Sequence, residues 1–207
     1  MRVLIAIKSC ERDAVNGCNV AQRVTWLPCV RGADYRFFVG QGHVTLQDDE
    51  VRVAAPDDYM ALPYKTREIV RWSLAADYDH VFLCDTDTYV RPMRLLASGF
   101  DRGDLVGCVN GPPSVPGAVE GKYAWVSGGN GYWLSRRAMS AVASHDPNHW
   151  AEDCWVAQVV QLQRLTVIDD QRYGNGEITT HFCSTGHKRL FEVTWMHEQH
   201  RLLGGTP

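Results

Sequence analysis

The stretch V-F-L-C-D-T-D-T-Y-V-R-P at residues 81–92 carries an apolar run directly into two carboxylates, Asp85 and Asp87, and then returns to apolar residues. The run that precedes Asp85 is typical of a buried strand. A charge at the end of such a strand is costly unless it is paired or bound to a metal ion. We therefore expect something to compensate both aspartates.

The segments around this stretch alternate between strand and helix patterns. Strands are expected at 3–7, 35–39, 80–84 and 104–109, and helices at 14–26, 59–76, 93–97, 136–144 and 150–162. Ser135 is a good residue to cap the helix at 136–144. This order predicts an α/β fold, with a mostly parallel central sheet flanked by helices. The Gly- and Pro-rich segment 111–121 is expected to be a loop, and the tail from Leu165 alternates only weakly.

The bulk composition limits the class of protein. A chain of 207 residues that is 45% hydrophobic is expected to form one domain, residues 1–207. Its formal charge of -3 provides no basic field for nucleic acid. No segment approaches the roughly 18 consecutive apolar residues of a membrane span. The seven cysteines contain no C-x-x-C pair, so we expect reduced thiols in a soluble, cytoplasmic protein and no zinc site.

The position of the aspartate pair indicates a metal site. Asp85 and Asp87 follow the apolar run of a strand, at the edge where open α/β sheets bind ligands. Carboxylate oxygens suit Mg²⁺ or Mn²⁺, and such ions commonly bridge a protein to a diphosphate. The spacing alone is weak, because Asp77-Tyr78-Asp79 repeats it in a polar turn a few residues upstream.

Five motifs occur in one order along the chain. They are K-S-C at 8–10 with A-Q-R-V-T-W at 21–26, Lys65-Thr66 followed by Trp72, D-T-D-T-Y-V at 85–90, S-G-G-N-G-Y-W-L-S at 127–135, and Glu152-Asp153-Cys154. With these motifs, residues 3–185 resemble the family-31 glycosyltransferases, the β1,3-galactosyl- and β1,3-N-acetylglucosaminyltransferases together with Fringe. Thr86 departs from that family, which has a middle aspartate there. The chain also lacks the anchor and stem of the Golgi enzymes, which favours a soluble bacterial or viral relative.

The resemblance implies a single catalytic domain of the glycosyltransferase GT-A fold. It implies a metal-dependent, inverting transfer of a hexose of the galactose or N-acetylglucosamine type. The donor would be a UDP-sugar, the cofactor Mn²⁺ or Mg²⁺, and the acceptor a glycan or lipid-linked saccharide joined through a β1,3 linkage.

The resemblance also implies roles for individual residues. Asp87 would bind the metal, and Asp85 would hold the ribose or a metal-bound water. His181 is the expected third ligand, although tail histidines are often simply solvated. Asp153 matches the family's base, and its apolar and aromatic neighbours would raise its pKa by desolvation. The structural alternative is that Glu152 and Asp153 only complement a helix dipole.

Further residues are candidates for contacts with the donor. Gly128 and Gly129 would let the backbone approach a sugar or phosphate, and Asn130 could bond the donor sugar. The same residues could form an ordinary turn before a helix. Lys65 and Arg23 are candidates for the nucleotide, with solvated helix positions as the alternative. Aromatic rings that suit sugars cluster near these motifs, and we expect at least one of them in the core: Trp125, Trp133 and Trp155.

Other functions are compatible with the same motifs. The closest alternative is a retaining transferase of the same fold class, in which Asp153 would not act as the base. Another is a carbohydrate- or nucleotide-binding module that has kept the fold and lost turnover. A metal-dependent phosphohydrolase ranks last, because it would require more clustered aspartates and histidines than one D-x-D motif provides.

Overall fold

The computed structural model describes residues 1–111, 123–182 and 189–204. Its strands are β1 (Val3–Lys8), β2 (Asp34–Val39), β3 (Glu50–Arg52), β4 (His80–Asp85), β5 (Thr88–Val90), β6 (Leu105–Gly107), β7 (Val109–Asn110), β8 (Trp125–Val126), β9 (Tyr132–Ser135), β10 (Val167–Asp169) and β11 (Thr179–His181). Its α-helices are α1 (Glu11–Val15), α2 (Cys18–Val24), α3 (Leu62–Ala75), α4 (Pro92–Leu96), α5 (Arg136–Ser144), α6 (Glu152–Leu162) and α7 (Arg189–Gln199). Short helical turns complete the described chain: η1 (Leu27–Cys29), η2 (Tyr59–Ala61), η3 (Phe100–Arg102), η4 (Gly128–Asn130) and the π-helical η5 (His200–Gly204).

Seven strands form one central sheet in the order β10-β6-β9-β4-β1-β2-β3. Strands β1, β2, β3 and β4 run parallel to one another, and β10 pairs parallel with β6. Strand β9 is antiparallel to both of its neighbours, β4 and β6. The expectation of a mostly parallel α/β sheet is thus confirmed, and β9 is an element that the sequence patterns did not predict.

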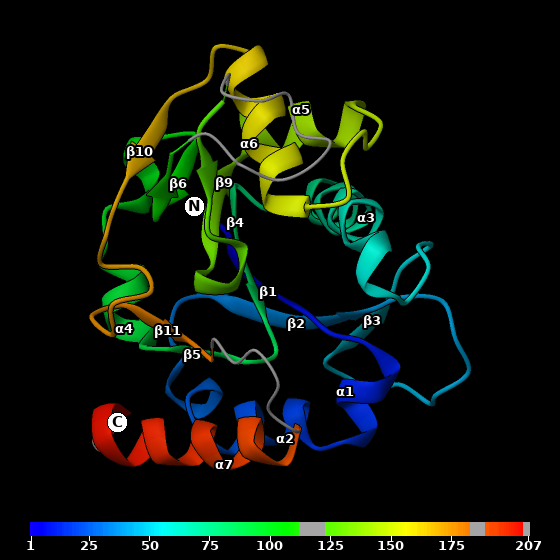
Figure 1. The fold of residues 1–207 in the computed structure, drawn as a ribbon, viewed down its shortest axis with the longest axis vertical. Coiled ribbons are helices and arrows are strands. Elements are labelled where there is room, and N and C mark those ends of the chain that lie inside the picture. Colours follow the sequence, from blue (N-terminus) through cyan, green and yellow to red (C-terminus); the bar gives the residue numbers. More distant parts are fainter. Residues whose placement is uncertain (112–122, 183–188, 205–207) are drawn as a thin grey trace.

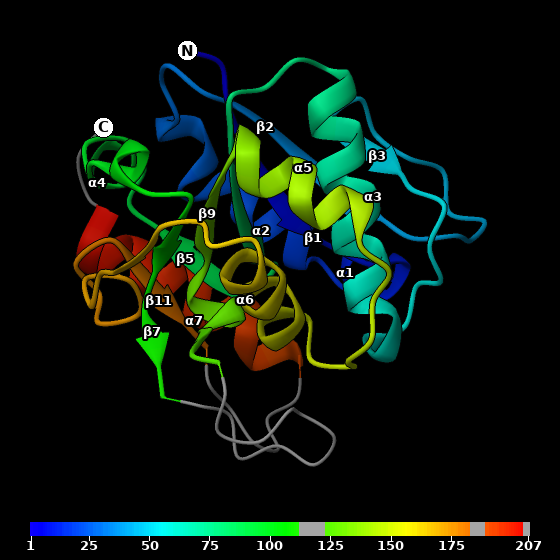
Figure 2. The same ribbon diagram turned by 90° about the horizontal axis from the view of Figure 1, so that it is seen from above.

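Both faces of the sheet are covered by helices. In β4, Val81 and Leu83 belong to one apolar cluster, whereas Phe82 and Cys84 belong to the other. This alternation follows from the two-residue period of a strand. Helices α3, α5 and α6 pack together on the first face, and Figure 2 shows them side by side. Helices α2 and α7 pack against each other on the opposite side, at the bottom of Figure 1.

The first predicted helix, residues 14–26, is wrong in its extent. The chain forms α1 up to Val15 and a separate α2 from Cys18, with Gly17 between them at a φ of +88°. That left-handed conformation interrupts a right-handed helix and favours glycine. The other four predicted helices correspond to helices of the structure, with bounds that differ by a few residues, and Ser135 caps α5 by accepting a hydrogen bond from the Ala138 amide.

The tail is more ordered than its weak alternation suggested. Strand β11 pairs antiparallel with β5, and α7 follows it. The loop expected at 111–121 lies outside the described residues, apart from Gly111. Six cysteines of the described chain are free thiols: Cys10, Cys18, Cys29, Cys84, Cys108 and Cys154. Among the described residues, no helix has the length and apolar character that crossing a membrane requires.

Candidate active site

The turn between β4 and β5 places both carboxylates of the D-x-D motif at the carboxyl end of β4. The buried side chain of Gln22 holds this turn, because its amide donates to the backbone oxygens of Asp85 and Thr86 at 3.1 and 2.8 Å. The middle residue, Thr86, is buried and donates to Asp13 at 2.7 Å. Asp85 and Asp87 therefore carry the charge of the motif, while Thr86 anchors the turn.

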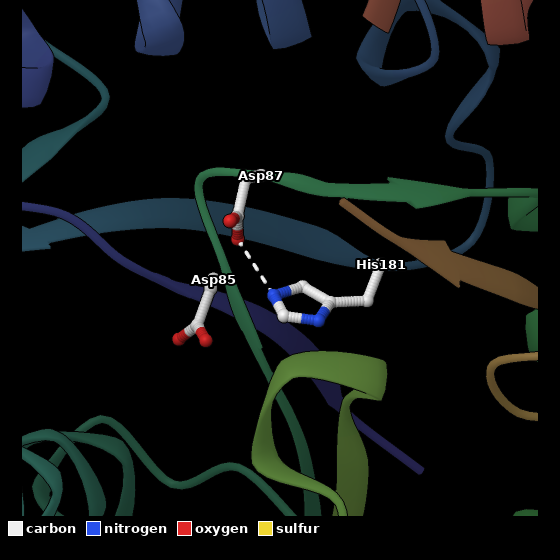
Figure 3. Close-up of side chains that lie close together, drawn as sticks. All are labelled: Asp85, Asp87 and His181. Carbon is white, nitrogen blue, oxygen red and sulfur yellow. Dashed lines mark ion pairs between the residues drawn. The ribbon is translucent and has the colours of Figure 1, made fainter. Parts of the chain in front are cut away.

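Asp85, Asp87 and His181 converge into one cluster (Figure 3). Each offers a ligand atom, and these atoms all lie within 4.8 Å of one another. His181 Nε2 lies 3.2 Å from Asp87 Oδ1. Two carboxylates and an imidazole form a donor set that suits a divalent ion such as Mn²⁺ or Mg²⁺. The structure thus brings together the three residues that the sequence suggested as metal ligands.

The β5–β11 pair explains why a residue so distant in sequence reaches the motif. His181 is the cross-strand partner of Thr88, and the Phe182 backbone amide donates to the backbone oxygen of Asp87 at 3.1 Å. Directly opposed residues of antiparallel strands have neighbouring side chains. The register of this short ribbon therefore sets the position of the imidazole beside Asp87.

Lys8 joins the cluster to a second group of carboxylates. It ends β1 and is the register partner of Asp85 at the end of β4. Its Nζ lies 3.2 Å from Asp85 Oδ1 and 3.1 Å from Glu152 Oε2, and its side chain is only 2% exposed. Burial opposes a charge on Lys8, but the two carboxylates outweigh it and raise the pKa of the ammonium.

Glu152 and Asp153 are adjacent in sequence but differ in environment. Glu152 is buried and accepts hydrogen bonds from Lys8, Thr66 and Tyr132. Asp153 accepts backbone amide bonds from Gly128 at 3.0 Å and from Cys154 at 2.8 Å. Burial raises the pKa of Asp153, and the charge of Glu152 raises it further. Glu152 is thus held by side chains on several sides, whereas Asp153 lines the cavity with a raised pKa.

The turn η4 separates the metal-ligand cluster from the acid pair. A Cβ atom added to Gly129 would lie 2.5 Å from His181 Cε1, and one added to Gly128 would lie 3.2 Å from both Asp153 Oδ2 and Glu152 Oε2. Real Cβ atoms do not approach other atoms as closely as the first of these distances. Glycine at 129 is therefore required for the imidazole to occupy its place.

A cavity of about 230 Å³ opens between these groups. Its walls contain both charged and aromatic residues, and they come from β1, β4, β8, η2, η4, α3, α6 and the segment before α6. The lining consists of Lys8, Tyr59, Leu62, Asp85, Trp125, Gly128, Gly129, Trp150, Ala151, Glu152, Asp153 and Cys154. A small molecule in this cavity would contact both Asp85 and Asp153.

The two cations that the sequence suggests for the nucleotide do not line this cavity. Lys65 is buried, pairs with Asp57 at 2.6 Å and donates to the Ser9 oxygen at 2.6 Å. Arg23 pairs with Asp49 and Glu50 at 2.6 and 2.8 Å. These ion pairs give both cations structural partners, so their assignment to the nucleotide stays a prediction.

Asn130 and the tryptophans also differ in their surroundings. The Asn130 side chain packs so closely on Gly174 that a Cβ atom there would lie 2.1 Å from its Nδ2. Trp133 and Trp155 are each 1% exposed and lie in the core, whereas Trp125 is partly exposed and lines the cavity. The expectation that at least one of these rings belongs to the core is confirmed.

The sequence does not indicate a place in the cavity for Lys8 or Tyr59, and it suggests Trp150 only as an aromatic neighbour of Asp153. Lys8 was read only as part of the opening-strand motif, and a parallel pairing of β1 with β4 would have placed it beside Asp85. Tyr59 and Trp150 lie outside the five motifs, and no pattern in the chain connects them.

Comparison with solved structures identifies the fold. A glycosyltransferase involved in the glycosylation of the major capsid of PBCV-1 matches 96% of this chain and 100% of its own, with a TM-score of 0.57 and 10% identity. The galactosyltransferase LgtC, in complex with donor and acceptor sugar analogs, matches 99% of this chain and 97% of its own, with a TM-score of 0.54 and 11% identity. An active-site mutant of LgtC matches with a TM-score of 0.52 and 12% identity. No family model and no curated protein matches the sequence.

These matches define the class of structure. The chain has the GT-A fold of glycosyltransferases, as the sequence resemblance implied. The similarity does not single out the family-31 enzymes among glycosyltransferases.

Proposed function

We propose that this protein is a metal-dependent glycosyltransferase that moves a hexose from a UDP-sugar to a saccharide acceptor. The observation that carries the proposal is the convergence of Asp85, Asp87 and His181 at the end of β4, with Asp153 across η4 from them. The GT-A fold supports it, because the neighbours with this fold are glycosyltransferases.

The donor set fits a divalent cation. Its three ligand atoms already lie within 4.8 Å of one another without rearrangement of the chain. Asp85, Asp87 and His181 would hold Mn²⁺ or Mg²⁺, which when bound supplies positive charge to the leaving diphosphate. Lys8 offsets part of the negative charge of Asp85, because its Nζ lies 3.2 Å from Asp85 Oδ1.

Asp153 is the proposed general base of an inverting reaction. The acceptor hydroxyl oxygen forms a bond to the anomeric carbon as the bond to UDP breaks, and the hydroxyl proton passes to Asp153. A raised pKa makes this carboxylate a stronger proton acceptor than an ordinary aspartate. The amide bonds from Gly128 and Cys154 fix the orientation of the carboxylate toward the cavity.

The sugar and linkage are inferred from the resemblance. It favours galactose or N-acetylglucosamine as the transferred hexose and β1,3 as the linkage. Proton NMR of the product reports its anomeric configuration: a β-linked product from an α-linked UDP-sugar supports inversion. An α-linked product would establish the retaining alternative and remove the base role of Asp153.

Titration calorimetry of UDP tests the donor site directly. UDP is expected to bind the protein in Mn²⁺, and to lose that binding in EDTA or in the Asp87→Asn variant. Asp34→Asn is a matched control, because Asp34 lies in β2 away from the metal-ligand cluster and the cavity. Equal binding of UDP in EDTA would refute the metal-dependent site, and absence of binding by the folded protein would refute the donor assignment.

A further inference from the structure

Two exposed aromatic side chains line the cavity beside Asp153, and the chemistry above does not use them. Tyr59 is 69% exposed and Trp150 is 37% exposed. They come from η2 and from the segment before α6, yet their ring centroids lie 6.3 Å apart. Large apolar side chains that meet at the mouth of a polar cavity are typical of a binding surface rather than of a core.

Local structure positions the Trp150 ring and the backbone of Tyr59. The Trp150 ring stacks on His149, with centroids 5.7 Å apart, and His149 Nδ1 accepts a hydrogen bond from the Ala151 amide at 3.0 Å. Tyr59 begins η2, whose preceding residue Asp58 caps the turn by accepting from the Ala61 amide at 2.9 Å. A surface arranged before a ligand arrives costs less conformational entropy on binding.

The pair is placed next to the proposed base. Trp150 precedes Asp153 by three residues, and both line the cavity together with Tyr59. Burial raises the pKa of the Tyr59 phenol, and the charges of Asp153 and Asp85 raise it further. Tyr59 and Trp150 thus line the same cavity as the proposed base.

We propose that Tyr59 and Trp150 form an acceptor platform, on which the apolar face of a neutral hexopyranose ring stacks with a hydroxyl directed at Asp153. This inference rests on the proposed transferase function and names where its acceptor binds. Sugar rings present C–H groups on a face and hydroxyls at the edge, which matches an aromatic surface bordered by hydrogen-bonding groups.

The charge of the lining indicates a neutral acceptor. Among the lining residues that the structure describes, Asp85, Glu152 and Asp153 are acidic, and Lys8 is the basic residue. Lys8 is already paired with Asp85 and Glu152. An acidic sugar would meet the like charge of these side chains, and Lys8 is already engaged by two of them, which disfavours binding.

Fluorine NMR of the full chain labelled with 5-fluorotryptophan tests the platform. The probes are methyl β-galactoside, methyl N-acetyl-β-glucosaminide and methyl β-glucoside, with methyl β-glucuronide as the acidic comparison, all in the presence of UDP and Mg²⁺. Trp150→Phe assigns the Trp150 signal. At least one neutral glycoside is expected to shift that signal, and Tyr59→Ala is expected to weaken its binding about tenfold.

Tyr64→Ala is the matched control. Tyr64 is a tyrosine of α3 that is 45% exposed and does not line the cavity, so its removal is expected to leave glycoside binding unchanged. The platform is refuted if no neutral glycoside shifts the Trp150 signal, or if Tyr64→Ala and Tyr59→Ala weaken binding equally. Glucuronide binding as tight as that of the neutral sugars refutes the neutral preference.

The calorimetric titration of UDP separates this inference from the proposed function. Intact metal-dependent UDP binding together with an unresponsive Trp150 signal refutes the platform and leaves the transferase standing. A glycoside shift at Trp150 in a protein that does not bind UDP supports the platform as a saccharide site. In that case the transferase proposal fails, and a carbohydrate-binding role takes its place.

Discussion

Lys8 connects the two acidic groups of the site through one buried ammonium. Its partner Glu152 is 4% exposed at the side chain, and Asp85 is 31% exposed. Removal of one member of a buried ion pair leaves an uncompensated charge, which costs more than the pair contributes when complete. The two carboxylates therefore require a positively charged side chain at position 8.

Replacement of Lys8 by methionine is expected to destabilise the fold by about 3–5 kcal/mol, because Glu152 loses its buried counter-charge. Urea unfolding followed by fluorescence measures this change. The same substitution made in a Glu152→Gln background is expected to cost less, since the charge that needed Lys8 is gone. Arg71→Met is the control, because its pair with Glu68 lies at the surface and is expected to contribute less than about 1 kcal/mol. Equal costs for Lys8→Met in both backgrounds would show that the pair is not coupled.

The proposed role of Asp153 makes a prediction about pH. A base must be ionised, so transfer is expected to be full above the pKa of Asp153 and to decline as the pH falls through it. Burial and Glu152 raise that pKa, so the acidic limb of kcat/KM is expected to lie above the value of about 3.9 that an ordinary aspartate shows. Asp153→Asn is expected to abolish transfer and to leave metal-dependent UDP binding nearly intact. Loss of both transfer and UDP binding in this variant would assign Asp153 a structural role.

At the scale of elements, η4 is the part of the site whose sequence is compatible with more than one role. The S-G-G-N-G motif was interpreted as a backbone approach to the donor or as an ordinary turn. The structure shows a 3-10 turn whose glycines make room for His181 and Asp153 of the same chain. Contacts between residues so distant in sequence depend on how β5 pairs with β11, and no local pattern contains that pairing.

Gly129→Ala is expected to displace the His181 ring and to weaken metal-dependent UDP binding at least about tenfold, since its Cβ would lie 2.5 Å from the imidazole. Calorimetry in Mn²⁺ measures the loss, and circular dichroism checks the fold. Gly111→Ala is the matched control, because a Cβ atom there would meet no atom of the described residues within 4 Å. UDP affinity equal to that of the unsubstituted protein would mean that the imidazole is not needed for the ion.

Strands β1 and β4 of the central sheet were among the most predictable elements. Residues 3–7 and 80–84 are apolar runs bounded by polar residues, and they form β1 and β4 within one residue at the carboxyl end. Strand β9 was not predicted, because the S-G-G-N-G-Y-W-L-S motif was read as a turn and a helix cap. The break between α1 and α2 at Gly17 was not predicted either, because the presence of a single glycine in a helical pattern does not determine its φ angle.

At the scale of the whole molecule, the site depends on segments from both ends of the chain. Lys8 comes from β1, Asp85 from β4, Asp153 from α6 and His181 from β11. The carboxyl ends of β1 and β4 bring the first two together, as the parallel sheet predicts. That residues 1–207 act as one catalytic domain stays a prediction. If it holds, a ligand bound at this site stabilises the whole chain against unfolding.

UDP and Mn²⁺ together are expected to raise the unfolding temperature. A ligand at 100 times its Kd stabilises the folded state by about 2.7 kcal/mol. For a chain of this size that corresponds to roughly 5–10 °C. Differential scanning calorimetry measures the shift, which EDTA and Asp87→Asn are each expected to remove. Because the proposed ligands and the proposed base span β4 to β11, a single transition that moves as a whole supports one cooperative catalytic domain. A shift confined to part of a split transition would show that the site is built on a unit smaller than the chain, and the one-domain prediction would then fail even if UDP binds.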